Sequence, residues 1–214
     1  MTDLTAIDIL IDPDDAMIAR AKAVNATMLG SIPSGFALDV HHRPHITSLQ
    51  RYVRTAELDD VFGAVRGVLA SVDVGSLELT AVAVRHMASA ATPGVGLAGI
   101  VVQPAPAVLD FQAKLIDAVR PFTGSGGTAD AYVRTDAEPD INQDTLEYIE
   151  HYVPDHSGEK FLGHVTVGLA KLDDLAAIEA EPFEPLTFSP AGVSVYKLGN
   201  NGTAAKHLQS FAVS

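Results

Sequence analysis

The sequence contains no cysteine and no tryptophan among its 214 residues. Without cysteine the chain can form no disulfide and can offer no thiolate to a metal, which is compatible with a cytoplasmic protein, the location that we expect. No run approaches the roughly 18 consecutive apolar residues of a membrane-spanning helix, and the N-terminal segment has no basic region ahead of its apolar residues. We therefore expect neither membrane association nor export.

Positive charge is also scarce. The chain has 14 Lys and Arg residues against 27 Asp and Glu residues, which gives a formal net charge of −13. Proteins that hold long nucleic acids neutralise phosphates with clustered Lys and Arg, so this class is disfavoured and a small substrate is favoured. Apolar residues make up 47% of the chain, which is ample for a core. We expect one globular domain over residues 1–214, acting as a monomer.

The chain repeats one order of predicted elements. Residues 5–11 (TAIDILI) are typical of a buried strand, and residues 13–28 carry apolar side chains at helical spacing. Residues 97–103 (LAGIVVQ) and 106–120 repeat this strand and helix, with a proline suited to the first helical turn. The pattern therefore starts again near residue 95.

The repeat extends through a histidine motif. The segments PHITSLQRYV and GHVTVGLA each place a histidine and a threonine two residues apart in a β-prone frame. Each is followed by Leu-Asp-Asp, then by helical spacing, then by another strand-like run, at residues 77–84 and 193–198. Each half therefore predicts strand, helix, strand, helix, strand. This order favours an α+β fold with two intertwined lobes, roughly residues 1–94 and 95–214.

The second half is longer than the first. The spacing of the histidines exceeds that of the repeat by about 27 residues, and residues 123–150 are the best candidate for this insertion because they are polar and open with glycine and serine. They end in a possible short helix. A lid over the site and a plain surface excursion are both compatible with this composition.

The motifs suit acid–base chemistry. Side chains alternate along a strand, so His45 and Thr47 point to one face, as do His164 and Thr166. If a pseudo-twofold relates the halves, the two pairs face one cleft. A neutral imidazole can then accept a proton while a charged one donates, and the threonine hydroxyls can bind phosphate oxygens. Neither a metal nor a cofactor is needed for this scheme.

PHITSL and GHVTVG resemble the two HxTx signatures of the 2H phosphoesterase superfamily, which includes the bacterial 2′-5′ RNA ligase-like proteins. The similarity covers nearly the whole chain, including the closing VSVYKLGNNGTAAKHLQSFAV. It implies a bilobal duplicated fold in which two antiparallel sheets line a central cleft, with the helices outside. It also implies cleavage of a 2′,3′-cyclic phosphate or a 2′-5′ bond in a small nucleotide or short RNA-derived oligonucleotide, hence a place in RNA processing. The resemblance assigns His45 and His164 as the acid–base pair and Thr47 and Thr166 as phosphate ligands.

Three further residues are weaker candidates for substrate binding. Arg43 and Arg51 concentrate positive charge near the first motif, and strand parity would place Arg51 beside His45 and Thr47. Tyr196 could stack on a nucleobase, although its strand favours a core tyrosine with its hydroxyl at the rim.

Two alternative functions stay open. The same fold could bind a phosphorylated or nucleotide ligand without turnover, because Gln50 and Leu169 stand where related proteins often have a basic residue. A metal phosphatase could use the cluster DVHHRPH, with His41 and His42 beside His45. This ranks lower because the proline breaks any helix that would align the histidines, and carboxylate partners are not obvious.

Overall fold

The computed structural model describes residues 3–39, 42–89, 92–103, 105–136 and 138–213. It contains two four-stranded antiparallel sheets. The first has the strand order β2-β1-β7-β8 and the second the order β5-β4-β3-β6. Their bounds are β1 Leu4–Pro13, β2 Ile46–Arg54, β3 Leu79–Ala88, β4 Val95–Gln103, β5 Gly163–Lys171, β6 Leu186–Phe188, β7 Pro190–Leu198 and β8 Ala204–Ala212.

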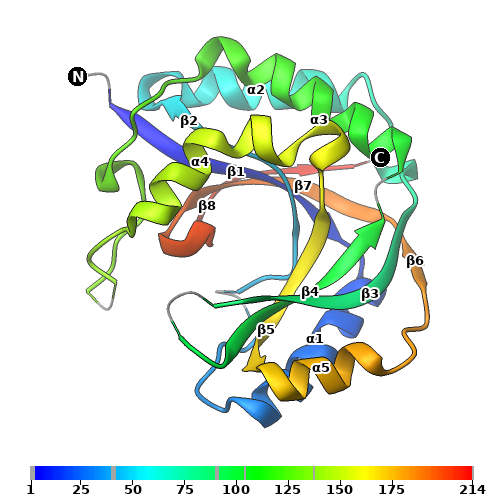
Figure 1. Ribbon diagram of the computed structural model, residues 1–214. Helices are drawn as coiled ribbons and strands as arrows, with labels where there is room; N and C mark the ends of the chain where they lie inside the picture. Colours follow the sequence, from blue (N-terminus) through cyan, green and yellow to red (C-terminus); the bar gives the residue numbers. More distant parts are fainter. Residues whose placement is uncertain (1–2, 40–41, 90–91, 104, 137, 214) are drawn as a thin grey trace.

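Five α-helices pack around the sheets: α1 Asp15–Ser31, α2 Leu58–Leu69, α3 Pro106–Val119, α4 Gln143–His156 and α5 Leu172–Ala180. Helices α2 and α3 cover the outer side of the first sheet, and α1 and α5 cover the second (Figure 1). The predicted α+β fold, with two antiparallel sheets and helices outside, is confirmed. In the part of the chain described here, no helix has the length and apolar character needed to cross a bilayer.

The two halves of the chain exchange elements. Strand β3 follows the first motif in sequence but joins the second sheet, while β7 follows the second motif and joins the first sheet. Helix α1 likewise leaves β1 and packs on β5. Each sheet is therefore completed by the opposite half.

A β-bulge follows the first motif. Ile9 pairs with Leu49, but the next residue, Leu10, pairs with Thr47, so Ser48 is an extra residue in β2. At a bulge, two successive residues of one strand lie opposite a single residue of the partner strand. Beyond the bulge, each side chain therefore points to the face opposite to the one that simple alternation predicts.

The second motif has a bulge at the matching place. Ala98 pairs with Gly168 and Gly99 pairs with Thr166, which leaves Val167 as the extra residue of β5. Gly168 has φ of +139°, a conformation that a side chain rarely tolerates. In both lobes, then, the residue directly after the motif threonine is bulged. The shared register makes Asp8 equivalent to Leu97, whereas the sequence pattern alone matched Leu97 with Thr5.

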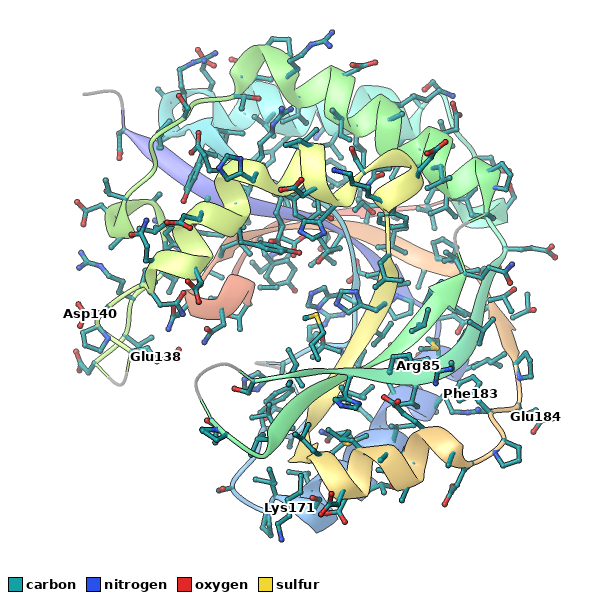
Figure 2. All side chains as sticks on the ribbon, in the orientation of Figure 1. Arg85, Glu138, Asp140, Lys171, Phe183 and Glu184 are labelled. Carbon is teal, nitrogen blue, oxygen red and sulfur yellow. The ribbon has the colours of Figure 1, made fainter. Side chains whose placement is uncertain are left out.

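The insertion packs on the first sheet through an apolar cluster of its own. The hydroxyls of Tyr52 on β2 and Tyr132 in the insertion share a hydrogen bond of 2.5 Å. The cluster contains Ala6, Tyr52, Ala131, Tyr132, Ile141, Ile149 and Leu198. The backbone of the insertion lies so close to β2 that a side chain at Gly127 would collide with the Tyr52 ring. The exposed carboxylates Glu138 and Asp140 mark its outer tip (Figure 2). The expected short helix is α4, which contacts β2.

Candidate active site

His45 stands one residue before β2 and its ring is fixed through Nδ1. This atom lies 2.7 Å from the carbonyl oxygen of Arg43. A carbonyl oxygen only accepts, so Nδ1 carries the proton and donates it. In the neutral ring Nε2 is then the unprotonated nitrogen, free to accept a proton from another molecule.

His164 on β5 repeats this arrangement. Its Nδ1 donates to the carbonyl oxygen of Leu162 at 3.0 Å, again two residues earlier in the chain. The ring lies over the backbone of Gly99, where an added Cβ would stand 3.3 Å from Cδ2 of the ring. Both histidines therefore hold the same tautomer and present the same nitrogen.

The two motif strands meet between the sheets. Strands β2 and β5 contact one another although they belong to different sheets. Burial lowers the pKa of His164 from its ordinary value; the hydrogen bond to Leu162 opposes this, and the charge of His45 lowers the pKa further. The structure thus brings both predicted histidines within electrostatic reach, with the His164 side chain still accessible to solvent.

A buried carboxylate lies beside His45. Oδ2 of Asp8 accepts hydrogen bonds from Thr47 Oγ1 at 3.0 Å and from Gln50 Nε2 at 2.8 Å, and it lies 4.0 Å from Nε2 of His45. Asp8 is fully buried and its Oδ1 has no partner among the described residues. Burial raises the pKa of Asp8, while the charge of His45 and the two hydrogen bonds oppose the shift. Sequence reasoning missed this residue, although an acid inside the apolar strand TAIDILI was the available signal.

The second lobe has no counterpart of this carboxylate. Asp8 pairs with Gln50 on the first sheet, and the equivalent pair on the second sheet is Leu97 with Leu169. The hydroxyl of Thr166 also differs from that of Thr47, because it forms no hydrogen bond within the part of the chain described. The histidines are thus presented alike but placed in unlike surroundings, because a carboxylate and an amide in the first lobe correspond to two leucines in the second.

Helix α4 brings an aromatic cluster to the site. The ring centroids of Tyr148 and His156 are 4.7 Å apart, and that of Tyr152 lies 5.4 Å from His156. Burial lowers the pKa of His156; Asp155 opposes this shift, and His164 lowers the pKa further. Burial, then Asp8, raises the pKa of Tyr148 to about 12. Tyr148 is nevertheless 42% exposed, so an aromatic surface borders the histidines.

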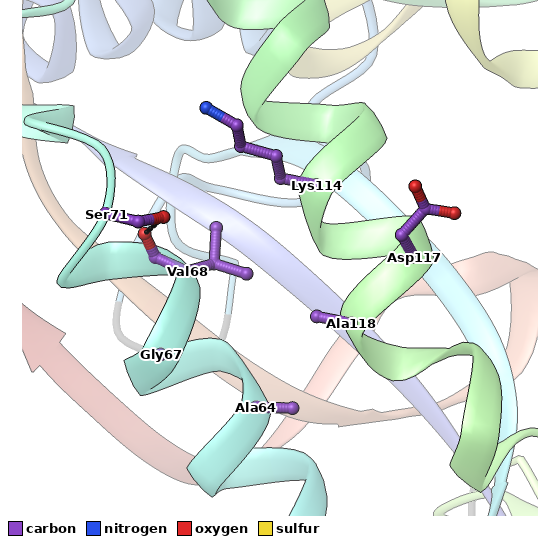
Figure 3. A pocket seen from close by; sticks show the side chains of 7 residues that line it. All are labelled: Ala64, Gly67, Val68, Ser71, Lys114, Asp117 and Ala118. Carbon is purple, nitrogen blue, oxygen red and sulfur yellow. Dashed lines mark hydrogen bonds between the residues drawn. The ribbon is translucent and has the colours of Figure 1, made fainter.

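This cluster forms one wall of a hollow of about 300 Å³ along α4. The hollow is lined by Asp144, Glu147, Tyr148, His151, Asp155 and His156. A larger hollow of about 530 Å³ lies between α2 and α3, on the side of the first sheet away from the histidines (Figure 3). It is an open surface groove with Ala64, Gly67 and Ala118 in its lining, and it contains none of the predicted site residues.

The two arginines that were weaker candidates for substrate binding lie in different surroundings. Arg43 contributes its carbonyl oxygen to His45, and its side chain is exposed. Arg51 does not share the face of the motif, because the bulge reverses the alternation; it pairs with the core residue Ile7, and Nη1 donates to the carbonyl of Ile116 on α3 at 3.5 Å. The strand-parity prediction for Arg51 is therefore not met.

Tyr196 lies on the same face as Asp8, with which it pairs across β1 and β7. It is only 8% exposed, and its ring meets the edge of His207 at 5.2 Å. Of its two interpretations, the packed tyrosine fits this placement.

Two histidines of the segment DVHHRPH, His42 and His45, have different partners. His41 lies outside the described residues, whereas His42 stacks on Phe36 at 4.9 Å, with its Nδ1 3.7 Å from Asp39. Among the residues that the structure describes, no three His, Asp or Glu side chains gather closely enough to hold a metal ion.

No protein-family model matches the sequence, and no curated protein is similar to it. Solved structures do resemble it. TT0787 of Thermus thermophilus superposes with a TM-score of 0.56 at 14% identity over 98% of each chain. E. coli LigT complexed with ATP superposes with a TM-score of 0.50 at 13% identity over 99% of each chain. The fold predicted from the sequence is thus confirmed: the chain has the duplicated α+β fold of these two proteins.

Proposed function

We propose that this protein is a phosphodiesterase in which His45 and His164 form the acid–base pair, acting without a metal on a 2′,3′-cyclic phosphate or a 2′-5′ bond. The substrate is a small nucleotide or a short oligonucleotide. The observation that carries the proposal is the matched presentation of the two Nε2 atoms, each produced by an Nδ1–H bond to the carbonyl two residues earlier. One geometry built twice, between two sheets, is what a pair of proton transfers requires.

The different surroundings of the two histidines favour different roles in proton transfer. His164, whose pKa burial lowers, is the neutral ring and takes a proton from the attacking water through Nε2. His45 lies 4.0 Å from the Asp8 carboxylate, which stabilises a positive ring, so it gives its proton to the departing ribose oxygen. The water oxygen bonds to phosphorus, the bond from phosphorus to the ribose oxygen breaks, and a phosphomonoester and a free hydroxyl result. Each proton transfer is typically worth about 10²–10⁴ in rate.

The threonines then have different tasks. Thr166 has an uncommitted hydroxyl and donates to a non-bridging phosphate oxygen in this proposal. Thr47 donates to Asp8 at 3.0 Å, so it holds the carboxylate and can reach the phosphate only by giving up that bond. The aromatic surface at Tyr148 is suited to stack on the nucleobase. The ATP bound to E. coli LigT supports a nucleotide ligand for this fold.

The test is turnover of the four 2′,3′-cyclic nucleotides in excess EDTA, with products resolved by chromatography. We expect a phosphomonoester from at least one nucleotide and no product from His164→Ala. Activity that disappears with EDTA and returns with a divalent cation would show a metal phosphatase instead. Binding of a cyclic nucleotide in calorimetry, with no product after prolonged incubation, would identify the non-catalytic binding module.

A further inference from the structure

We infer that Asn25 and Gln112 are positioning residues: two buried amides that each tie the segment leading to one motif histidine to the bulge beside the other. The catalytic consequence rests on the proposed function. The geometry itself can be tested without turnover.

The bulges create the need for these amides. A bulged residue drops out of the regular ladder, so its backbone groups lose their strand partners. Ser48 and Val167 are the bulged residues, and both are buried. A buried carbonyl without a donor destabilises the fold, so something other than the neighbouring strand must supply an N–H group at each bulge.

Gln112 on α3 supplies it for the first motif. Its Nε2 donates to the carbonyl oxygen of Ser48 at 3.0 Å and to that of His156 at 3.1 Å, while its Oε1 accepts from the backbone N–H of Gly158 at 3.2 Å. The side chain is 1% exposed. The segment from His156 to Gly158 leads into β5 and hence into His164.

Asn25 on α1 does the same for the second motif. Its Nδ2 donates to the carbonyl oxygens of Val167 at 2.8 Å and Phe36 at 3.0 Å, and its Oδ1 accepts from the backbone N–H of Leu38 at 3.1 Å. The side chain is 4% exposed. The segment from Phe36 to Leu38 leads toward His45.

The two sets of contacts match bond for bond. Each amide bonds one bulge carbonyl, one carbonyl upstream of a motif, and the N–H group two residues after that carbonyl. The connection is crossed, because Gln112 joins the first bulge to the second approach segment and Asn25 joins the second bulge to the first. Only an amide offers two donors and one acceptor in one planar group, which explains why polar residues occupy core positions of these helices.

The spacing of the two histidines therefore depends on both amides at once. A displacement of about 1 Å in a catalytic group can cost about 10² in rate even when its cause lies away from the reacting atoms. We expect Gln112→Glu, which keeps the length and removes both N–H donors, to lower kcat at least about tenfold on a cyclic nucleotide, with KM changed less than about threefold.

The decisive readout is ¹⁵N NMR of the imidazole rings. Gln112→Glu and, separately, Asn25→Ser should each shift the ring signals of both His45 and His164, because each contact set touches both motifs. The matched control is Thr5→Val, which removes the hydrogen bond between the hydroxyl of Thr5 on β1 and that of Thr55, directly after β2 and away from the motifs. It should lower Tm while leaving both ring signals in place.

Folded variants with unchanged kcat and unmoved ring signals would overturn the inference, as would a shift confined to one histidine. If Gln112→Glu fails to fold, Gln112→Met removes the donors without adding a charge and carries the same expectation. If the wild-type protein turns over no cyclic nucleotide, the proposed function fails, whereas the NMR comparison still decides the role of the two amides.

Discussion

The two histidines are the residues on which the chemistry depends. Replacing either His45 or His164 with alanine should lower kcat/KM by about 10² or more, because one proton transfer is lost. The double variant should be far less impaired than the product of the single losses, since both rings serve one step. Steady-state kinetics on a cyclic nucleotide measures all three. Near-full activity of folded His164→Ala on every cyclic nucleotide would remove the basis of the two-histidine mechanism.

The pH profile should report the pair. The kcat/KM of the wild-type protein should rise and then fall with pH, and its acidic limb should lie below pH 6.5 because burial lowers the pKa of His164 from that value. Asp8→Asn removes the carboxylate that lies 4.0 Å from Nε2 of His45, so we expect the folded variant to have a lower kcat/KM than the wild type at the wild-type pH optimum. An unchanged kcat/KM in folded Asp8→Asn would show that Asp8 has no influence on the acid.

Asp8 also makes a prediction about stability. Its pKa is raised in the folded protein above the ordinary value of 3.8, so the unfolded chain loses this proton first and the free energy of unfolding falls as pH rises through the folded pKa. Asp8→Asn escapes this loss. Thermal unfolding from pH 3.5 to 8 should therefore show Tm of the variant gaining on the wild type as pH rises. A Tm of the variant that falls relative to that of the wild type as pH rises would contradict the buried charge.

Replacing each motif threonine with alanine should have a different effect. Thr166→Ala removes an uncommitted hydroxyl donor and should cost about 1–3 kcal/mol of transition-state stabilisation, seen mainly in kcat. Thr47→Ala leaves Asp8 with one hydrogen bond fewer, so the pKa of Asp8 should rise further and the pH dependence of Tm should change. Thr→Ser at each position is the control that keeps the hydroxyl. Equal effects of the two alanine variants on the rate and on the pH dependence of Tm would exclude this division of tasks between the threonines.

At the level of elements, the strand and helix order was predictable because apolar periodicity carries it. The bulges were not predictable, since the two-residue periodicity of a strand contains no signal for one extra residue. This is why Arg51 was expected beside His45, and why it lies on the opposite face. The candidate histidines and threonines could be found because their pattern occurs twice, whereas Asp8, Asn25 and Gln112 act alone or through the backbone. Their signal is a polar residue at a core position.

Tyr148 on helix α4 allows a test of whether the insertion binds the nucleobase. Tyr148→Ala should raise KM for cyclic nucleotides about tenfold with kcat changed less than twofold, because base stacking on an aromatic ring is worth about 1–3 kcal/mol. Tyr148→Phe keeps the ring and should keep KM. An unchanged KM in the alanine variant would show that the nucleobase lies elsewhere.

For the whole molecule, the net charge of −13 should limit the length of the substrate. Each added phosphate meets a repulsive field, so KM should rise from a cyclic mononucleotide to a longer oligonucleotide that ends in the same group. Added salt should reduce this difference, which is the reverse of the salt dependence of a basic RNA-binding protein. Tighter binding of longer oligonucleotides at low salt would contradict the prediction.

The exchange of β3 and β7 between the sheets also governs how the chain can fold. Neither half can complete a sheet before the other has been synthesised, so the pairings that close the structure join residues far apart in sequence. Such non-local pairing slows folding. The strands that carry the two histidines are thereby joined into one cooperative unit. Almost the entire chain must therefore leave the ribosome before His45 and His164 can come together between the sheets.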